Sequence, residues 1–215
     1  HKIGKNSGRT RMSAKTFNEL AQGYDEDPRR QQTAEAIFQA ILRLVPLSKE
    51  MEVLECGAGT GLLTVLLAPK VKRILATDAS EGMLLVLREK RSRLGLSNVD
   101  TDLYDPTGQS MESSFGLLVA SMLLHHIPDT EGVLRRFYGS LTLNGWVAIA
   151  DLEEEDGSFH SPEMPKPAHY GFNRSNVVKS LEAAGFCNVY IETIHVAVKN
   201  ERQYPIFLAV AKRGR

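Results

Sequence analysis

The chain has 215 residues, 42% of them hydrophobic, which is enough for one packed α/β domain with a small accessory part. Lys plus Arg equals Asp plus Glu at 26 each, so the zero net charge gives no overall electrostatic signature for nucleic acid. Two cysteines are too few for a disulfide framework, and no apolar run approaches the roughly 20 residues of a membrane span. We therefore expect a soluble protein in a reducing, cytoplasmic compartment.

The N-terminal region divides into an arm and a helical segment. Residues 1–12 place basic side chains among Gly, Ser and Asn, which predicts a disordered arm or the remnant of a tag. Residues 13–21 have the pattern of a short amphipathic helix, and Tyr24 follows it. Asp27 and Pro28 are an N-cap and a first helical residue, so a long helix should run from there to Pro46.

A glycine-rich turn follows the first predicted strand. The apolar run at 53–56 has the length of a buried parallel strand, and the apolar residues from Leu62 to Ala68 predict a helix. The glycines Gly57, Gly59 and Gly61 allow a left-handed backbone and the close approach of a ligand. Their spacing is G-x-G-x-G, whereas a dinucleotide fingerprint would need glycine where Leu62 stands.

An acid closes the second predicted strand, which covers residues 73–77. Asp78 lies roughly 20 residues beyond the first glycine, where α/β nucleotide sites place an acceptor for two ribose hydroxyls. A helix is predicted to begin directly after it, so Asp78 could instead be a helix N-cap.

The second half of the chain continues the α/β pattern. Strands are predicted near 98–101 and at 114–121 and 146–151, with a helix after Asp129 and a long irregular loop at 152–170. The fourth strand leads into Leu124-His125-His126-Ile127-Pro128-Asp129. Runs at 189–196 and 204–210, joined by a polar turn, predict an antiparallel hairpin.

The stretch Glu55-Cys56-Gly57-Ala58-Gly59-Thr60-Gly61 resembles the first motif of class I S-adenosylmethionine-dependent methyltransferases. Two further segments resemble the ubiquinone/menaquinone-type members: F-x-x-x-A-x-x-Y-D from Phe17 to Asp25, and the L-H-H-I-P-D segment. The resemblance implies a Rossmann-like, doubly wound, seven-stranded mixed sheet with a C-terminal antiparallel hairpin and an N-terminal helical lid. It also implies one methyltransferase domain over 13–215, with the lid at 13–46 and the core at 47–215.

The resemblance further implies a set of cofactor contacts with S-adenosylmethionine. Glu55 would meet the methionine amino group, Asp78 the ribose and Asp102 the adenine, although Asp100 and Asp105 lie close to the last position. The full predicted set is Glu55, Gly57, Ala58, Gly59, Asp78, Ala79, Met83, Asp102, Leu103 and Ser121. For Met83, simple core packing is the alternative.

The predicted catalytic residues are His125, His126 and Tyr24, and Tyr24, His125, His169 and Tyr170 are predicted to contact the acceptor. Either of the adjacent histidines could be a general base, because imidazole titrates near neutral pH. The alternatives are a backbone-bonded histidine at a helix start and, for Tyr24, an aromatic that pins the lid. As a metal pair the histidines lack a third ligand at suitable spacing, so we expect no metal site.

The predicted function is transfer of the sulfonium methyl to a small-molecule acceptor by in-line displacement, without nucleic acid and without a transmembrane segment. Two alternatives remain open at the level of sequence. An NAD-dependent oxidoreductase would use the same strand, turn and ribose acid, and a non-catalytic cofactor-binding module would act as a regulator.

Overall fold

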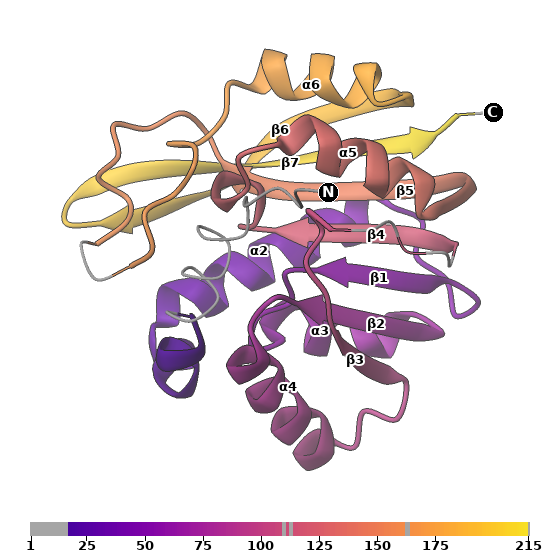
Figure 1. The fold of residues 1–215 in the computed structure, drawn as a ribbon, viewed down its shortest axis with the longest axis horizontal. Coiled ribbons are helices and arrows are strands. Elements are labelled where there is room, and N and C mark those ends of the chain that lie inside the picture. Colours follow the sequence, from indigo (N-terminus) through magenta and orange to yellow (C-terminus); the bar gives the residue numbers. More distant parts are fainter. Residues whose placement is uncertain (1–16, 109–110, 112–113, 162–163, 215) are drawn as a thin grey trace, which may run out of the picture.

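Seven strands form one mixed sheet in the order β3-β2-β1-β4-β5-β7-β6, with helices on both faces (Figure 1). The computed structural model describes residues 17–108, 111, 114–161 and 164–214. In chain order the elements are η1 (Ala21–Glu26), α2 (Pro28–Leu44), β1 (Glu52–Cys56), α3 (Leu62–Leu67), η2 (Ala68–Lys70), β2 (Arg73–Asp78), α4 (Glu81–Leu94), β3 (Val99–Leu103), β4 (Phe115–Ser121), η3 (Leu124–His126), α5 (Thr130–Gly139), β5 (Leu141–Leu152), α6 (Arg174–Ala183), β6 (Phe186–Lys199) and β7 (Arg202–Arg213).

The pairing of the strands confirms the predicted fold class. Strands β1 to β5 are parallel, and β7 lies antiparallel between β5 and β6. Asn200 and Glu201, both at positive φ, close the β6–β7 hairpin, as a two-residue turn matched to the strand twist requires. The order reverses between β1 and β4, and in open α/β sheets such a reversal opens a crevice at the carboxyl ends of the strands.

Successive side chains along a strand point to opposite faces of the sheet, and each face has its own hydrophobic core. Val53 and Leu117 pack with α2, α3 and α4 on one face. Leu54 and Leu118, one residue further along each strand, pack with α5 and α6 on the other. The central strand β4 carries no charged residue because both of its faces are buried.

Side-chain caps fix where the helices begin. The Asp27 side chain accepts from Arg29 N at 3.0 Å, which confirms the predicted cap of α2. Helix α4 is capped by Ser80, whose Oγ accepts from Met83 N at 3.2 Å. The alternative reading of Asp78 as the cap of that helix is therefore wrong.

The N-terminal segment docks onto the glycine turn and α4. Residues 17–20 are helical and lead into η1. Asn18 Oδ1 accepts from Ser80 Oγ and from Gly82 N, each at 2.7 Å. Asp25 accepts from Thr60 Oγ1 at 2.5 Å and from Lys90 Nζ at 2.6 Å. The predictions for residues 1–12, and for the part of the first helix before residue 17, lie outside the described residues.

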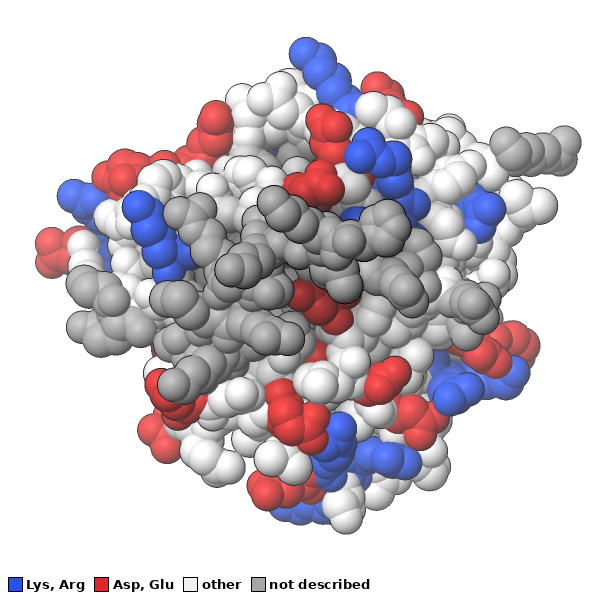
Figure 2. Space-filling model, viewed as in Figure 1, with Lys and Arg blue, Asp and Glu red and all other residues white. Residues whose placement is uncertain are grey.

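The surface carries interspersed charges of both signs. On the face shown in Figure 2, acidic and basic side chains of the described residues alternate around the rim, and no broad single-sign patch forms among them. Within the described ranges, every helix is too short or too polar to cross a membrane.

Candidate active site

A cavity of about 1100 Å³ opens where the sheet order reverses. Its wall combines the carboxyl ends of β1, β2 and β4 with the N-terminal segment and the loop after β5. Twelve predicted site residues line it: Tyr24, Gly57, Ala58, Gly59, Asp78, Ala79, Met83, Ser121, His125, His126, His169 and Tyr170. Three predicted residues do not line it, namely Glu55, Asp102 and Leu103.

The glycine turn and Asp78 form one hydrogen-bonded unit. Gly57 and Gly59 have φ values of +71° and +57°, the left-handed region that glycine enters without steric cost. Asp78 Oδ2 accepts from Gly59 N and Oδ1 accepts from Ser80 N, both at 2.8 Å. Burial raises the pKa of Asp78, and these backbone donors oppose that rise. The carboxylate is thus held at the cavity wall with lone pairs left for a pair of hydroxyl donors.

Glu55 lies beneath the turn, away from the wall. Its side chain is 1% exposed, and Oε2 accepts from Thr64 Oγ1 at 2.7 Å. Oε1 is buried and has no hydrogen-bond partner within the described part of the chain. Burial raises the pKa of Glu55 to about 7, partly opposed by the Thr64 hydrogen bond. Glu55 does not line the cavity, and its predicted contact with the methionine amino group stays a prediction.

Asp102 and Leu103 are exposed on β3 and stay outside the cavity. Strand β3 ends with Leu103 paired to Asp78, so the residues that reach the cavity are the next ones, Tyr104 to Thr107. Asp105 lines the wall there, and its Oδ1 accepts from Thr107 N at 2.9 Å. Of the three acids near the end of β3 that the sequence offered, Asp105 lines the cavity, and the adenine contact stays a prediction.

A buried hydrogen bond joins Asp151 of β5 to His125, which follows the end of β4. His125 Nδ1 lies 2.6 Å from Asp151 Oδ1, and the two side chains are 2% and 0% exposed. Asp151 Oδ2 also accepts from His125 N at 3.2 Å, and Oδ1 from Leu152 N at 2.8 Å. The carboxylate therefore fixes both the backbone and the ring of His125. Sequence reasoning missed Asp151, although an acid at the end of an apolar fifth strand must lie beside the end of the fourth.

His126 and His160 complete a cluster with His125. Ring centroids lie 4.1 Å apart for His125 and His126, 5.0 Å for His125 and His160, and 5.4 Å for His126 and His160. Burial, then the neighbouring rings, lowers the pKa of His126 to about 2. Burial and His125 lower the pKa of His160 to about 4. The expectation of no metal site assumed that a third ligand was lacking, whereas the fold brings His160 to the pair from 34 residues away in sequence.

The loop after β5 is attached to the same histidine segment. Ala168 N and His169 N donate to His125 O at 2.8 and 3.0 Å, and the His169 ring Nε2 lies 2.9 Å from Ile127 O. Tyr170 is 45% exposed at the rim. The loop thus closes one side of the cavity over the histidines.

Tyr24 closes the opposite side. The guanidinium of Arg30 stacks on its ring at 3.7 Å, and Arg30 Nη1 donates to the Tyr24 carbonyl at 2.6 Å. Burial raises the pKa of the Tyr24 hydroxyl, and Arg30 opposes that rise. This side chain therefore both pins the lid and faces the cavity, so the two interpretations from sequence are compatible.

Comparisons of the sequence with known proteins all point to methyltransferases. The family model described as "Methyltransferase domain" matches residues 29–191. An uncharacterized methyltransferase of Schizosaccharomyces pombe is 28% identical over 156 residues, which cover 66% of this chain and 55% of that protein. Trans-aconitate 2-methyltransferase of Variovorax paradoxus is 33% identical over 126 residues, covering 57% of this chain and 46% of that protein. The chain therefore spans only about half the length of these curated relatives.

Solved structures share the fold. The DhpI complex with S-adenosylhomocysteine has a TM-score of 0.78 at 19% identity, covering 98% of each chain. Phosphoethanolamine N-methyltransferase 2 of Haemonchus contortus, in complex with S-adenosylmethionine, has a TM-score of 0.68 at 17% identity and covers 83% of this chain and 52% of that one. At these identities the likeness concerns the arrangement of helices and strands.

Proposed function

The chain belongs to the class I S-adenosylmethionine-dependent methyltransferase family, and on that premise we propose that it transfers a methyl group to a small-molecule acceptor. One observation carries the proposal. Asp78, held by the Gly59 amide of the glycine turn, shares a cavity with a wall of histidines. One end of this cavity can hold a nucleoside, and the other end offers polar side chains to a second molecule.

The residues of the first end fit the cofactor. A Cβ built on Gly59 would meet nothing within 4 Å, so the turn leaves open space beside the Asp78 carboxylate. We assign Asp78 to the ribose hydroxyls, Asp105 to the adenine side and Ser121 to the methionine end. Bound S-adenosylmethionine would supply a methyl group on a positively charged sulfur, which is already a strong electrophile. The tasks left to the protein are alignment and the exclusion of water.

The acceptor half consists of side chains from three parts of the chain. Tyr24 comes from the lid, His125 and His126 from the segment after β4, and His169 and Tyr170 from the loop after β5. We assign Tyr24, His125 and His126 to orienting the acceptor beside the methyl group. This largely imidazole wall suits a small polar metabolite, in line with the relatives named for trans-aconitate and phosphoethanolamine.

Calorimetry with S-adenosylhomocysteine and, separately, NAD tests the cofactor assignment. We expect the first to bind and the second to give no heat above dilution. Tight binding of NAD alone would favour the oxidoreductase alternative and overturn the proposal. The glycine spacing and the family match already disfavour that alternative.

Methyl transfer itself is tested with S-adenosylmethionine that carries a labelled methyl group. The purified chain is incubated with a pool of small metabolites, and we expect the label to appear in one of them. A chain that binds the cofactor without labelling any small, protein or RNA pool would be the non-catalytic module. Label found only in RNA or protein would contradict the small-molecule acceptor.

Three narrower predictions remain proposals. The ubiquinone/menaquinone-type subclass is supported by the Phe17–Asp25 and L-H-H-I-P-D segments. A single methyltransferase domain with a lid over 13–46 is supported by the docking of Asn18 and Asp25 on the core. A reducing, cytoplasmic compartment is supported by two cysteines that are both free thiols.

A further inference from the structure

Three histidine rings converge on one point of the cavity wall. His125 and His126 follow β4, and His160 comes from the loop after β5. Each ring can offer one nitrogen, and these three nitrogens lie within 4.8 Å of one another. All three rings line the same cavity, so a small ion could reach them.

The hydrogen bonds of these rings leave lone pairs unused. Nδ1 of His125 is taken by Asp151, so its Nε2 is the nitrogen left for another partner. Nδ1 of His160 is buried and has no hydrogen-bond partner among the residues that the structure describes. A buried polar nitrogen without a partner is unfavourable, and a cation bound to this nitrogen would remove the penalty.

We propose that His125, His126 and His160 bind one divalent transition-metal ion of the zinc type. Imidazole is a preferred ligand of such ions, and three histidines form a known open zinc site. The Asp151 carboxylate on the far nitrogen of His125 provides the outer-shell partner that metal-bound histidines usually have. Nitrogens around a tetrahedral ion at about 2.1 Å would lie about 3.4 Å apart, so the cluster contracts from its present spacing on binding.

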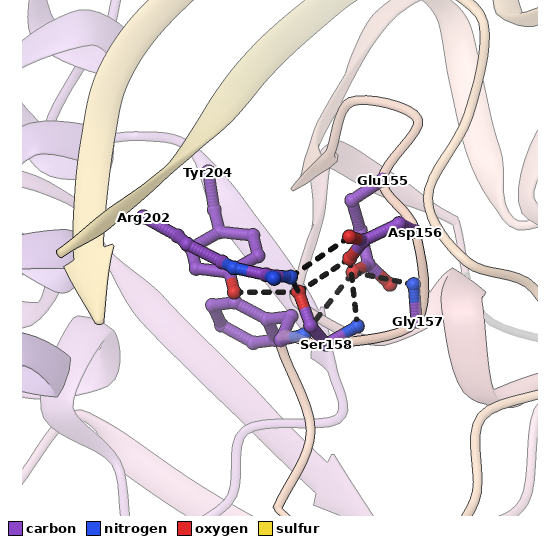
Figure 3. Close-up of polar contacts among 7 residues, drawn as sticks. Glu155, Asp156, Gly157, Ser158, Arg202 and Tyr204 are labelled. Atoms are coloured by element: carbon purple, nitrogen blue, oxygen red, sulfur yellow. Dashed lines mark hydrogen bonds and ion pairs between the residues drawn. The ribbon is translucent and has the colours of Figure 1, made fainter. Parts of the chain in front are cut away.

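A hydrogen-bond network holds the third ligand in place. Figure 3 shows Glu155 to Ser158, from the loop after β5, beside Arg202 and Tyr204 of β7. Glu155 Oε2 accepts from Gly157 N at 2.8 Å and from Phe159 N at 3.1 Å. Ser158 Oγ lies 2.8 Å from the Tyr204 hydroxyl. These hydrogen bonds of Glu155 and Ser158 therefore shape the backbone that leads to His160.

Two charged groups near the histidine cluster affect the electrostatic energy of a bound cation. Asp151 contributes a buried negative charge on one side of the cluster. Lys199 is close enough to act on His160, and its Nζ donates to Phe159 O at 2.6 Å. With three protein ligands, the fourth coordination position of the ion faces the cavity, where the acceptor of the proposed function would lie. Metal binding itself does not depend on that function.

The experiment titrates the tag-free, chelator-treated protein with Co²⁺, whose visible absorption reports tetrahedral nitrogen coordination, and measures zinc content after purification. We expect one ion per chain. His160→Gln and His126→Gln should each lower Co²⁺ affinity by more than about 100-fold, beyond the loss typical of an outer-shell partner. His195→Gln removes a histidine of β6 that does not line the cavity and should leave affinity unchanged.

Two results would overturn the proposal. One is the absence of any cobalt spectrum from the folded protein, and the other is a spectrum that survives in the His126→Gln, His160→Gln double variant. Thermal unfolding with and without zinc checks that each variant is folded, since only a protein that binds the ion gains stability from it. Binding of S-adenosylhomocysteine is measured on the same samples, so that failure of the metal site is distinguished from failure of the cofactor site.

Discussion

The cofactor half and the acceptor half of the cavity differ in whether backbone or side-chain groups form them. The ribose part of the cofactor half is mostly backbone: a turn of glycines, the Asp78 carboxylate, and amides that hold that carboxylate in place. These parts lie within 25 residues of each other, from Gly57 to Ser80. The acceptor half is mostly side chains, and Tyr24, His125 and His160 come from segments up to 136 residues apart.

This difference determines what each half tolerates. A backbone site is damaged by added atoms, because a Cβ changes the allowed dihedrals and fills the space for a ligand. A side-chain site is damaged by removed atoms, because each buried polar group relies on another for its hydrogen bond. Substitutions of the two kinds therefore test the two halves separately.

The largest effect is expected in the acceptor half. Asp151→Ala leaves the buried His125 ring and amide without their acceptor, and each buried polar group left unsatisfied costs about 1 to 3 kcal/mol of unfolding free energy. Urea unfolding measures it. As the control, Asp100→Ala removes the exposed carboxylate that pairs with Arg73 and should change stability by less than about 1 kcal/mol. Equal losses in the two variants would mean that the buried pair is not special.

The second-largest effect is expected in the cofactor half, on ligand affinity, when Asp78 is replaced. Asp78→Ala removes the acceptor for two ribose hydroxyls, and charge-assisted bonds of this kind predict a loss of about 3 kcal/mol, or roughly 100-fold, in affinity for S-adenosylhomocysteine. Calorimetry measures the loss. Asp102→Ala is the matched control, because Asp102 is exposed and outside the cavity, and its affinity should stay within about twofold of the wild type. A strong loss in the control would restore the adenine contact predicted from sequence.

A smaller effect is expected in the glycine turn, where two substitutions distinguish backbone and packing strain from loss of space for the ligand. A Cβ on Gly61 would lie 2.2 Å from Leu87 Cδ1 at φ +82°, so Gly61→Ala should cost about 2 kcal/mol of stability. A Cβ on Gly59 meets nothing within 4 Å, so Gly59→Ala should cost only about 1 kcal/mol, from its positive φ. The order should reverse for affinity, where Gly59→Ala weakens S-adenosylhomocysteine binding more. If both properties fall in parallel, the turn acts only through stability.

The same contrast explains which parts of the site the sequence could predict. The strand, the turn and Asp78 form a local pattern, since each role follows from the chain within a few dozen residues. The strands and the C-terminal hairpin were predictable because apolar runs and turn residues are also local signals, whereas the doubly wound sheet was implied by the family resemblance.

Long-range contacts were not predictable in this way. His160 reaches His126 only because the loop after β5 folds against β7, and nothing in the spacing of the two residues encodes that. The choice among the acids near β3 depends on a similar long-range contact. The end of β3 is fixed by its pairing with β2, and this pairing leaves Asp102 on the exposed strand and places Asp105 at the cavity wall.

The smallest expected effect is the change in stability per pH unit that Glu55, the acid beneath the glycine turn, produces. Glu55 has a pKa of about 7 in the folded protein, against an ordinary value of 4.5, because burial disfavours its charged form. Between these two values the folded state binds the proton more tightly than the unfolded state. Its contribution to stability is therefore fully present below pH 4.5 and is lost as the pH rises through 7, by up to about 1.4 kcal/mol per pH unit.

The histidine cluster has the opposite dependence, which makes the comparison sharp. The pKa of His126 is lowered in the folded state, so its contribution is present above pH 6.5 and is lost as the pH falls. In wild-type protein the two trends oppose each other between pH 4.5 and 6.5, and only a difference isolates either one. Urea unfolding of Glu55→Gln and wild type across pH 4.5 to 8 should therefore give a stability difference that changes in favour of the variant as the pH rises. A difference that stays constant would show that this carboxyl is already ionised at low pH, and that the buried Oε1 has a partner which stabilises its charge.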